Sequence, residues 1–111
     1  MLPENGSLLR IYVGESEKHD GVPLYQWIVR QARDHKLAGA TVMRAVEGYG
    51  AHSKIHTVKL LDLSTDLPMV VEMVDEPEKI EAFLEYISAI VPEGLATVEK
   101  VHLRLYRFKQ P

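Results

Sequence analysis

The chain has 111 residues, of which 46% are hydrophobic and 26% are charged, so it can bury one core and has no room for a second domain. Sixteen acidic and thirteen basic residues give a formal charge of -3, which disfavours a general nucleic-acid binder, and the lack of cysteine excludes disulfides and thiolate zinc sites. The start of the chain lacks a signal-peptide pattern, and no apolar run approaches the roughly 20 residues that span a bilayer. We expect a single cytoplasmic domain over residues 1–111.

The first half of the chain predicts a strand, a helix and a second strand. In SLLRIYVGE, alternation places Leu9, Ile11 and Val13 on one face of a strand. The segment DGVPLYQWIVRQARDHKLAG predicts a helix that begins near Pro23 and is stopped by Gly39. The β-branched residues of ATVMRAVEGYG predict the second strand.

The second half predicts a strand, a helix and a last strand. DLPMVVEMVD predicts the third strand, and Asp75 with Glu78 matches a D-x-x-E capping box at the start of a helix. The apolar stripe of that helix is Ile80, Phe83, Leu84, Ile87, Ile90 and Val91. Pro92 and Gly94 end the helix, and LATVEKVHLRLYRF alternates as a fourth strand.

The order βαββαβ predicts an α+β, ferredoxin-like sandwich: a four-stranded antiparallel sheet with both helices on one face. The other face of the sheet is then uncovered. Alternation assigns to this face the side chains of Leu8, Arg10, Tyr12, His102, Arg104 and Tyr106. Two interpretations stay open: a partner subunit covers these side chains, or they lie along the sheet with polar ends in water.

The segment EGYGAHSKIHT lies between the second and third strands and is longer than a tight hairpin needs. Gly48 and Gly50 flank Tyr49, and glycine allows a positive φ and close approach of an anion to backbone N–H groups. A strand end with a local twist is the alternative interpretation. We predict an effector-responsive loop whose partner-contacting residues are Ala51, His52, Ser53, Lys54 and His56.

Metal binding and hydrolysis are weakly supported by the residue types in this segment. His52 and His56 are four residues apart, but the nearby glycines disfavour a helix and no third ligand is close in sequence. Ser53 and His56, with Asp62 or Asp66, provide the residue types of a catalytic triad without a nucleophile elbow. We therefore expect no metal site and no enzymatic activity.

Three segments carry a resemblance to a known family: GVPLYQWIVRQARDHKLAGATVMRAVEGYG, SKIHTVKLLDLSTDLPMVVEMVD and EGLATVEKV. Over nearly its whole length the chain resembles the uncharacterised PII-like family called domain of unknown function 190. Its PII relatives are ferredoxin-like trimers that bind adenine nucleotides between subunits and control protein partners through a long loop between strands two and three. The resemblance implies the same architecture here, with no required cofactor and with a protein target such as a membrane transporter or channel.

The resemblance also implies a nucleotide site. Gly48, Tyr49 and Gly50 resemble the PII element at the start of the loop, and Gly94 and Thr97 correspond to the phosphate-binding loop after the second helix. That second loop has one glycine and an acidic Glu93 where PII proteins have several glycines and a lysine, so AMP or ADP is expected rather than ATP. Arg104 and Arg107 are the basic residues that a neighbouring subunit would contribute. The alternative is a metal-binding or stress-tolerance trimer of the copper-tolerance type.

Overall fold

The computed structural model of the chain describes residues 4–49, 56–57, 67–105, 107 and 109. Its elements are β1 (Asn5–Gly14), β2 (Lys18–His19), β3 (Val22–Pro23), α1 (Leu24–Asp34), β4 (Thr41–Arg44), β5 (Glu47–Gly48), β6 (His56–Thr57), β7 (Pro68–Asp75), α2 (Pro77–Ser88) and β8 (Leu95–His102). None of the described helices is long and apolar enough to cross a membrane.

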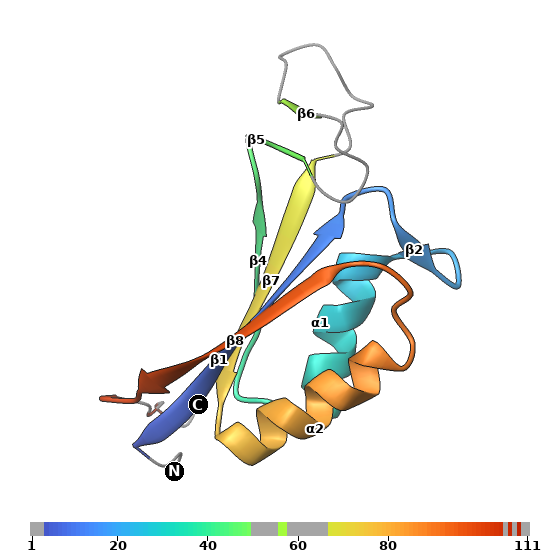
Figure 1. Cartoon of the computed structure of the whole chain (residues 1–111). Helices are drawn as coiled ribbons and strands as arrows, with labels where there is room; N and C mark the ends of the chain where they lie inside the picture. The colour runs from blue at the N-terminus through green and yellow to red at the C-terminus, as the bar shows by residue number, and fades with distance from the viewer. Residues whose placement is uncertain (1–3, 50–55, 58–66, 106, 108, 110–111) are drawn as a thin grey trace.

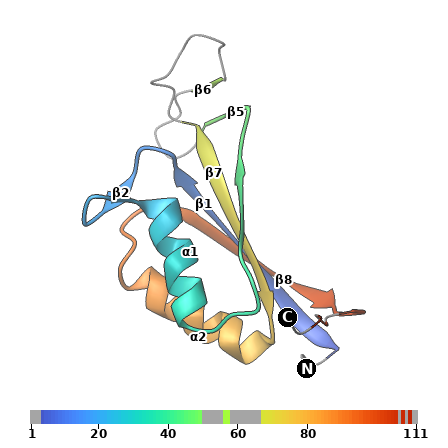
Figure 2. The same ribbon diagram turned by 180° about the vertical axis from the view of Figure 1, so that it is seen from behind.

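The main sheet has four antiparallel strands in the order β4-β7-β1-β8. Both helices cover the same face of this sheet (Figures 1 and 2). This confirms the predicted α+β, ferredoxin-like arrangement. Two short hairpins, β2-β3 and β5-β6, are added to the predicted elements.

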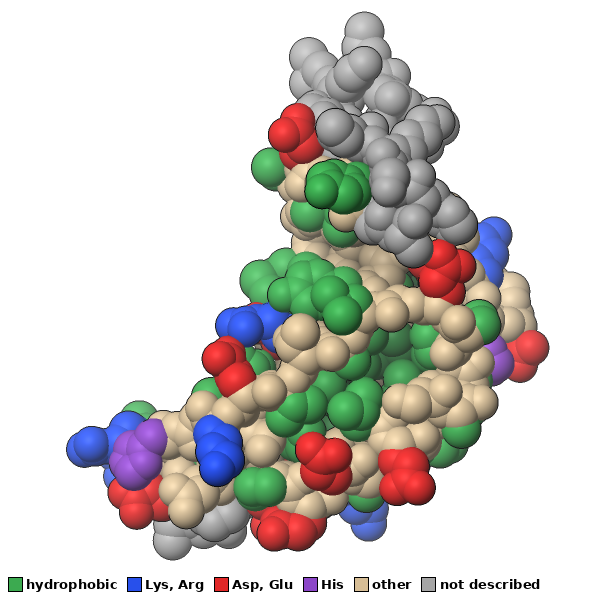
Figure 3. Space-filling model, in the orientation of Figure 1, with side chains coloured by type: hydrophobic (Ala, Val, Ile, Leu, Met, Phe, Trp, Pro, Cys, Tyr) green, Lys and Arg blue, Asp and Glu red, His purple; other side chains and the backbone are tan. Residues whose placement is uncertain are grey.

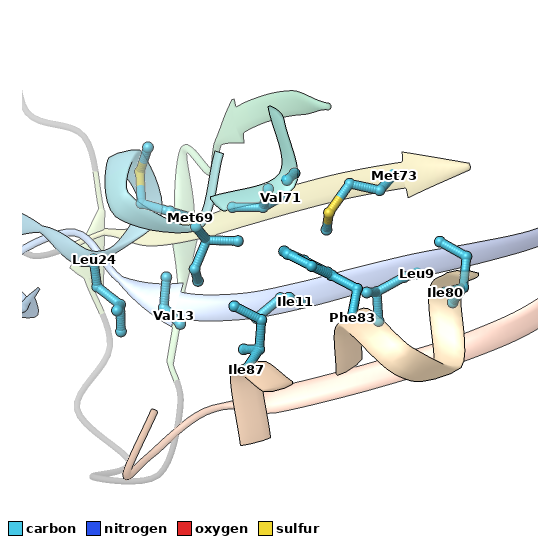
Figure 4. Packing of buried hydrophobic residues seen from close by; sticks show 12 residues of the cluster. Leu9, Ile11, Val13, Leu24, Met69, Val71, Met73, Ile80, Phe83 and Ile87 are labelled. Carbon is cyan, nitrogen blue, oxygen red and sulfur yellow. The ribbon is translucent and has the colours of Figure 1, made fainter. Parts of the chain in front are cut away.

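The core fills the space between the sheet and the helices. β1 contributes Leu9, Ile11 and Val13, as the alternation predicts, and Figure 4 shows Phe83 and Ile87 of α2 directed toward them. The complete buried cluster is Leu9, Ile11, Val13, Leu24, Ile28, Ala32, Met69, Val71, Met73, Ile80, Phe83 and Ile87. Full burial of a side chain of this size contributes about 1.5 to 3 kcal/mol, so this cluster is the main source of stability.

The end of α1 differs from the prediction that Gly39 stops the helix. The helix ends at Asp34, and Lys36 takes the left-handed conformation with φ of 62°. The N–H groups of Lys36 and Leu37 donate to the carbonyls of Arg33 and Ala32, at 2.9 and 3.0 Å. These two hydrogen bonds form a Schellman motif with lysine at the position that usually holds glycine.

The start of α2 corrects the predicted capping box. The residue before the helix is Glu76, which makes no side-chain cap hydrogen bond, and Pro77 begins the helix. Asp75 is instead fully buried at the end of β7. Its carboxylate accepts hydrogen bonds from the N–H groups of Ala38, at 2.8 Å, and Glu76, at 2.7 Å. Asp75 therefore joins the segment before β4 to the start of α2, which a local sequence pattern cannot indicate.

We call the sheet face away from the helices the outer face. The pairing of β1 with β8 sets Leu8 opposite Glu99 and Tyr12 opposite Leu95, so odd-numbered residues of β8 lie on the outer face. The outer face is formed by Thr41, Met43, Val70, Glu72, Val74, Leu8, Arg10, Tyr12, Leu95, Thr97, Glu99 and Val101, none of which is buried.

The prediction that His102 and Arg104 share the outer face with Tyr12 is wrong. His102 pairs with Asn5, whose side chain has the same orientation along β1 as that of Leu9, on the side of the helices. Arg104 lies beyond the end of β8, and Tyr106 lies outside the described residues. The alternation along β8 is as predicted, but the observed pairing with β1 places the even-numbered residues of β8 on the side of the helices, which exchanges the two predicted faces.

Candidate functional site

Gly48 ends β5 at the base of the predicted effector-responsive loop. It pairs with His56 of β6, and its backbone does not use the left-handed conformation that glycine allows. A Cβ at Gly48 would lie 3.0 Å from Cγ of Pro68, so close packing against β7 is one reason for glycine at this position. Tyr49 follows with 65% of its surface exposed. The predicted site residues Gly50, Ala51, His52, Ser53 and Lys54 lie outside the described residues.

Gly94 makes the turn between α2 and β8. Its φ is 154°, and a Cβ there would lie 3.1 Å from the Tyr12 carbonyl oxygen and 3.4 Å from Cγ1 of Val13. A larger residue would meet both a strained backbone and a fixed neighbour on β1. The backbone alone therefore explains why this position is glycine, whether or not a ligand approaches it.

A cleft of about 360 Å³ lies beside Gly94, between the end of α2 and the start of β8. Figure 3 shows hydrophobic side chains gathered in a hollow on this side of the molecule. The cleft is lined by Ile11, Leu84, Ile87, Ser88, Val91, Pro92, Glu93, Gly94, Leu95 and Ala96. Its volume falls in the range of small-molecule sites, and its walls fit an apolar ring. No lysine or arginine lines it, so it holds no positive charge for a phosphate.

Gly48 and Gly94 lie at the same end of the main sheet. Gly48 packs on Pro68, Pro68 pairs with Gly14 at the end of β1, and Gly94 packs on Tyr12 two residues earlier. β7 and β1 thus lie between the two glycine elements. Three spacings of about 4.8 Å between neighbouring strands give a separation of about 14 Å.

The remaining predicted residues lie away from these glycines. Thr97 pairs with Arg10 on the outer face. Arg104 and Arg107 follow β8, whose last residue His102 pairs with Asn5 at the start of β1. These arginines are therefore at the opposite end of the sheet from Gly94, and one chain does not bring them to the glycine elements.

The centre of the outer face holds a charged cluster that the sequence analysis did not identify. Arg10 Nε donates to Glu72 at 2.6 Å, and an Arg10 terminal nitrogen donates to Glu99 at 2.9 Å. The hydrogen bond to Glu72 raises the pKa of Arg10 above its usual value. The three residues come from β1, β7 and β8, so only the pairing of the strands reveals the cluster.

A second ion pair, also absent from the predicted site, lies at the base of the loop. Arg44 Nε donates to Glu15 at 2.8 Å, and a terminal nitrogen donates to the other carboxylate oxygen at 3.1 Å. The hydrogen bond that Arg44 donates to Glu15 raises the pKa of Arg44. Arg44 pairs with the buried Met69, so it occupies a helix-side position of β4. A charged residue at such a position is the signal in the sequence that could have indicated the ion pair.

Within the described residues, no group of three or more histidine, aspartate or glutamate side chains is placed to hold a metal ion. His56 is described only as a backbone partner of Gly48. His52 lies outside the described residues.

Comparison with known proteins decides the family. The model of DUF190, described as Uncharacterized ACR, matches residues 6–103. The chain belongs to this family. A UPF0166 protein of Aquifex aeolicus (strain VF5) is 45% identical to the DUF190 chain over 96 residues, which cover 86% of this chain and 90% of that relative.

Solved structures place the DUF190 chain in a wider fold group. CPII bound to ADP and bicarbonate, from Thiomonas intermedia K12, superposes with a TM-score of 0.66 at 16% identity and covers 89% of this chain and 88% of that chain. The divalent ion tolerance protein CutA1 from Ehrlichia chaffeensis gives a TM-score of 0.58 at 14% identity, with coverages of 94% and 86%. At these identities the likeness establishes a common PII-like fold.

Proposed function

We propose that the protein is a non-enzymatic PII-like regulator that binds AMP or ADP in the clefts between the subunits of a homotrimer. In this proposal it signals through the segment between β5 and β7. The observation that carries the proposal is the position of two glycine elements, Gly48 and Gly94, at the same end of a PII-like sheet. CPII, which has the same fold, was crystallised with ADP.

The trimer is supported by the outer face. Leu8, Tyr12, Val70 and Val74 form an apolar surface on the two central strands, and no element of the described chain covers it. Uncovered apolar pairs such as these, Leu8 with Val74 and Tyr12 with Val70 on either side of Arg10 and Glu72, are characteristic of protein contacts. Assembly also provides a way to bring Arg104 and Arg107 of one copy to the glycine elements of another.

The charge near Gly94 supports a nucleoside monophosphate or diphosphate over a triphosphate. The cleft beside Gly94 has apolar walls and Glu93, with no basic side chain among its lining residues. A triphosphate would place more negative charge near this carboxylate than AMP does, at a cost that grows with each phosphate. AMP or ADP is therefore the proposed effector.

The second candidate is a metal-binding trimer of the copper-tolerance type, favoured by the fold likeness to CutA1. Both candidates predict trimers, so the ligand must distinguish them. The regulated protein is proposed to be a membrane transporter or channel. Capture of protein partners from the native host with the tagged chain, with and without AMP, tests this part of the proposal.

Isothermal titration calorimetry of the purified chain against AMP, ADP, ATP, Zn²⁺ and Cu²⁺ tests the two candidates. We expect saturable binding of AMP or ADP that exceeds the binding of ATP. Stoichiometric Zn²⁺ or Cu²⁺ binding without any nucleotide binding would favour the metal-binding trimer and contradict the regulator.

A further inference from the structure

Arg44 and Glu15 form an ion pair at the base of the loop, and what we infer from it rests on the proposed function. Arg44 is the last residue of β4, two residues separate it from β5, and Glu15 follows the last residue of β1. Two hydrogen bonds, of 2.8 and 3.1 Å, join both oxygens of the carboxylate to the guanidinium. The pair therefore lies at the end of the sheet that also holds Gly48.

The fold does not depend on this pair to close the base of the loop. The N–H of Glu15 donates to the Leu67 carbonyl at 2.9 Å, and the N–H of Ala45 donates to the Pro68 carbonyl at 3.0 Å. These backbone bonds already fix β1 and β4 to the start of β7. The side chains of Arg44 and Glu15 are 46% and 27% exposed, and an ion pair as open to water as this one adds little stability.

The chemistry of the pair matches that of an anion site. A guanidinium offers two parallel N–H donors that fit a carboxylate and a phosphate equally well. The Glu15 carboxylate thus occupies the position that a phosphate group would take on Arg44. The neighbouring candidate residues Gly48 and Tyr49 carry no positive charge, so a phosphate at this base needs a cation from elsewhere.

We propose that Arg44 is a ligand of the effector phosphate and that Glu15 competes with the effector for it. The Arg44–Glu15 pair and the Arg44–phosphate pair are then mutually exclusive. The effector must displace the Glu15 carboxylate from Arg44, which lowers the effector affinity. A dianionic phosphate displaces this carboxylate better than a monoanion does. Effector binding frees Glu15, which is hydrogen-bonded through its backbone to the residue before β7.

Four versions of the full chain test this: unmodified, Arg44→Gln, Glu15→Gln and the double variant. Calorimetric titration with AMP and with ADP at low salt gives each affinity. We expect Arg44→Gln to weaken binding at least tenfold, and Glu15→Gln to strengthen it severalfold. Because Glu15 acts through Arg44, the double variant should bind as weakly as Arg44→Gln alone.

Two control variants separate the pair from general charge effects. Asp20→Asn removes one negative charge from the exposed β2-β3 turn, and Arg33→Gln removes one exposed positive charge at the end of α1. Both should leave affinity within about twofold, since their charges lie in water. Circular dichroism melting of every variant verifies that each is folded at the titration temperature.

The outcomes distinguish this inference from the proposed function. If the unmodified chain binds AMP or ADP and Arg44→Gln binds equally well, the inference is wrong and the proposed function stands. If Glu15→Gln strengthens nucleotide binding and the double variant keeps this gain, Glu15 does not compete with the effector for Arg44. If only Glu15→Gln binds nucleotide, the inference is supported, because Glu15 then blocks Arg44 in the unmodified chain. The absence of nucleotide binding by all four versions overturns both.

Discussion

Gly48 and Gly94 occupy the two glycine elements of the candidate site, yet the structure requires glycine for different reasons. Gly94 combines a φ of 154° with a fixed carbonyl of Tyr12 at 3.1 Å from a Cβ position. Gly48 lies in a short strand, and its limiting neighbour is the side chain of Pro68. A ring carbon at the surface can shift where a strand carbonyl cannot, so the two positions differ in tolerance.

This difference predicts that Gly94→Ala destabilises the fold more than Gly48→Ala does. For Gly94→Ala we expect a loss of about 1 to 3 kcal/mol in the free energy of unfolding, from backbone strain and the contact with β1. For Gly48→Ala we expect a loss below about 1 kcal/mol. Urea denaturation of both variants measures this. Equal losses would show that the Gly94 turn is not strained by a side chain.

The end of α1 shows how an element can stop without the residue its pattern favours. Lys36 adopts φ of 62°, and the two Schellman hydrogen bonds to Arg33 and Ala32 hold it there. Its carbonyl also accepts a hydrogen bond from Lys79 Nζ at 3.0 Å, which ties the end of α1 to α2. Tertiary packing of Leu37 on the core thus maintains a backbone conformation that lysine by itself disfavours.

Replacing Lys36 with glycine should stabilise the protein. The expected gain is up to about 1 kcal/mol, because glycine adopts positive φ without the Cβ penalty. Thermal melting followed by circular dichroism measures the gain, and Lys36→Ala is the control that removes the side chain but keeps the Cβ. If Lys36→Ala raises the melting temperature as much as Lys36→Gly does, the gain does not come from the backbone.

Local periodicity in the sequence predicts several elements, because their apolar side chains alternate along a strand or repeat on one face of a helix. Leu9, Ile11 and Val13 of β1 are buried as predicted, and so are Ile80, Phe83 and Ile87 of α2. What periodicity cannot supply is the pairing of segments far apart in the chain. The register between β1 and β8 decides that Thr97 lies beside Arg10 on the outer face and that His102 lies on the side of the helices.

The candidate site could likewise be predicted from the sequence only where a local pattern marks it. The glycine elements could be identified because glycine marks special backbone positions. The Arg44–Glu15 pair joins residues 29 positions apart through a turn and two strand ends, so no local pattern indicates it. The buried role of Asp75, which the D-x-x-E pattern assigned to a helix cap, depends likewise on Ala38 approaching from another segment.

For the whole molecule, the outer face carries the claim of assembly. It presents apolar side chains around the Arg10, Glu72 and Glu99 cluster, and in the described residues nothing covers it. A homotrimer that buries this face would remove apolar area from water at roughly 25 cal/mol per Å². It would also remove the charged cluster from water, so that hydrogen bonds between the strands must compensate its charges.

A charge on the outer face should therefore break the assembly. We expect Val70→Asp to shift the chain from trimer to monomer at micromolar concentration, because an unpaired carboxylate is costly to bury. Val98→Asp is the matched control, since Val98 is 40% exposed on the helix side of β8. Size-exclusion chromatography with light scattering measures both. Dissociation by Val98→Asp and not by Val70→Asp would place the interface on the other side of the sheet.

Native mass spectrometry of the purified chain with AMP tests the central claim in one experiment, because it reports assembly and ligand together. The account predicts a species of three 12.6 kDa chains that carries up to three AMP molecules, with AMP absent from any monomer because the site needs two subunits. A monomer as the main species, or a trimer that takes up neither AMP nor ADP at any concentration, would contradict it.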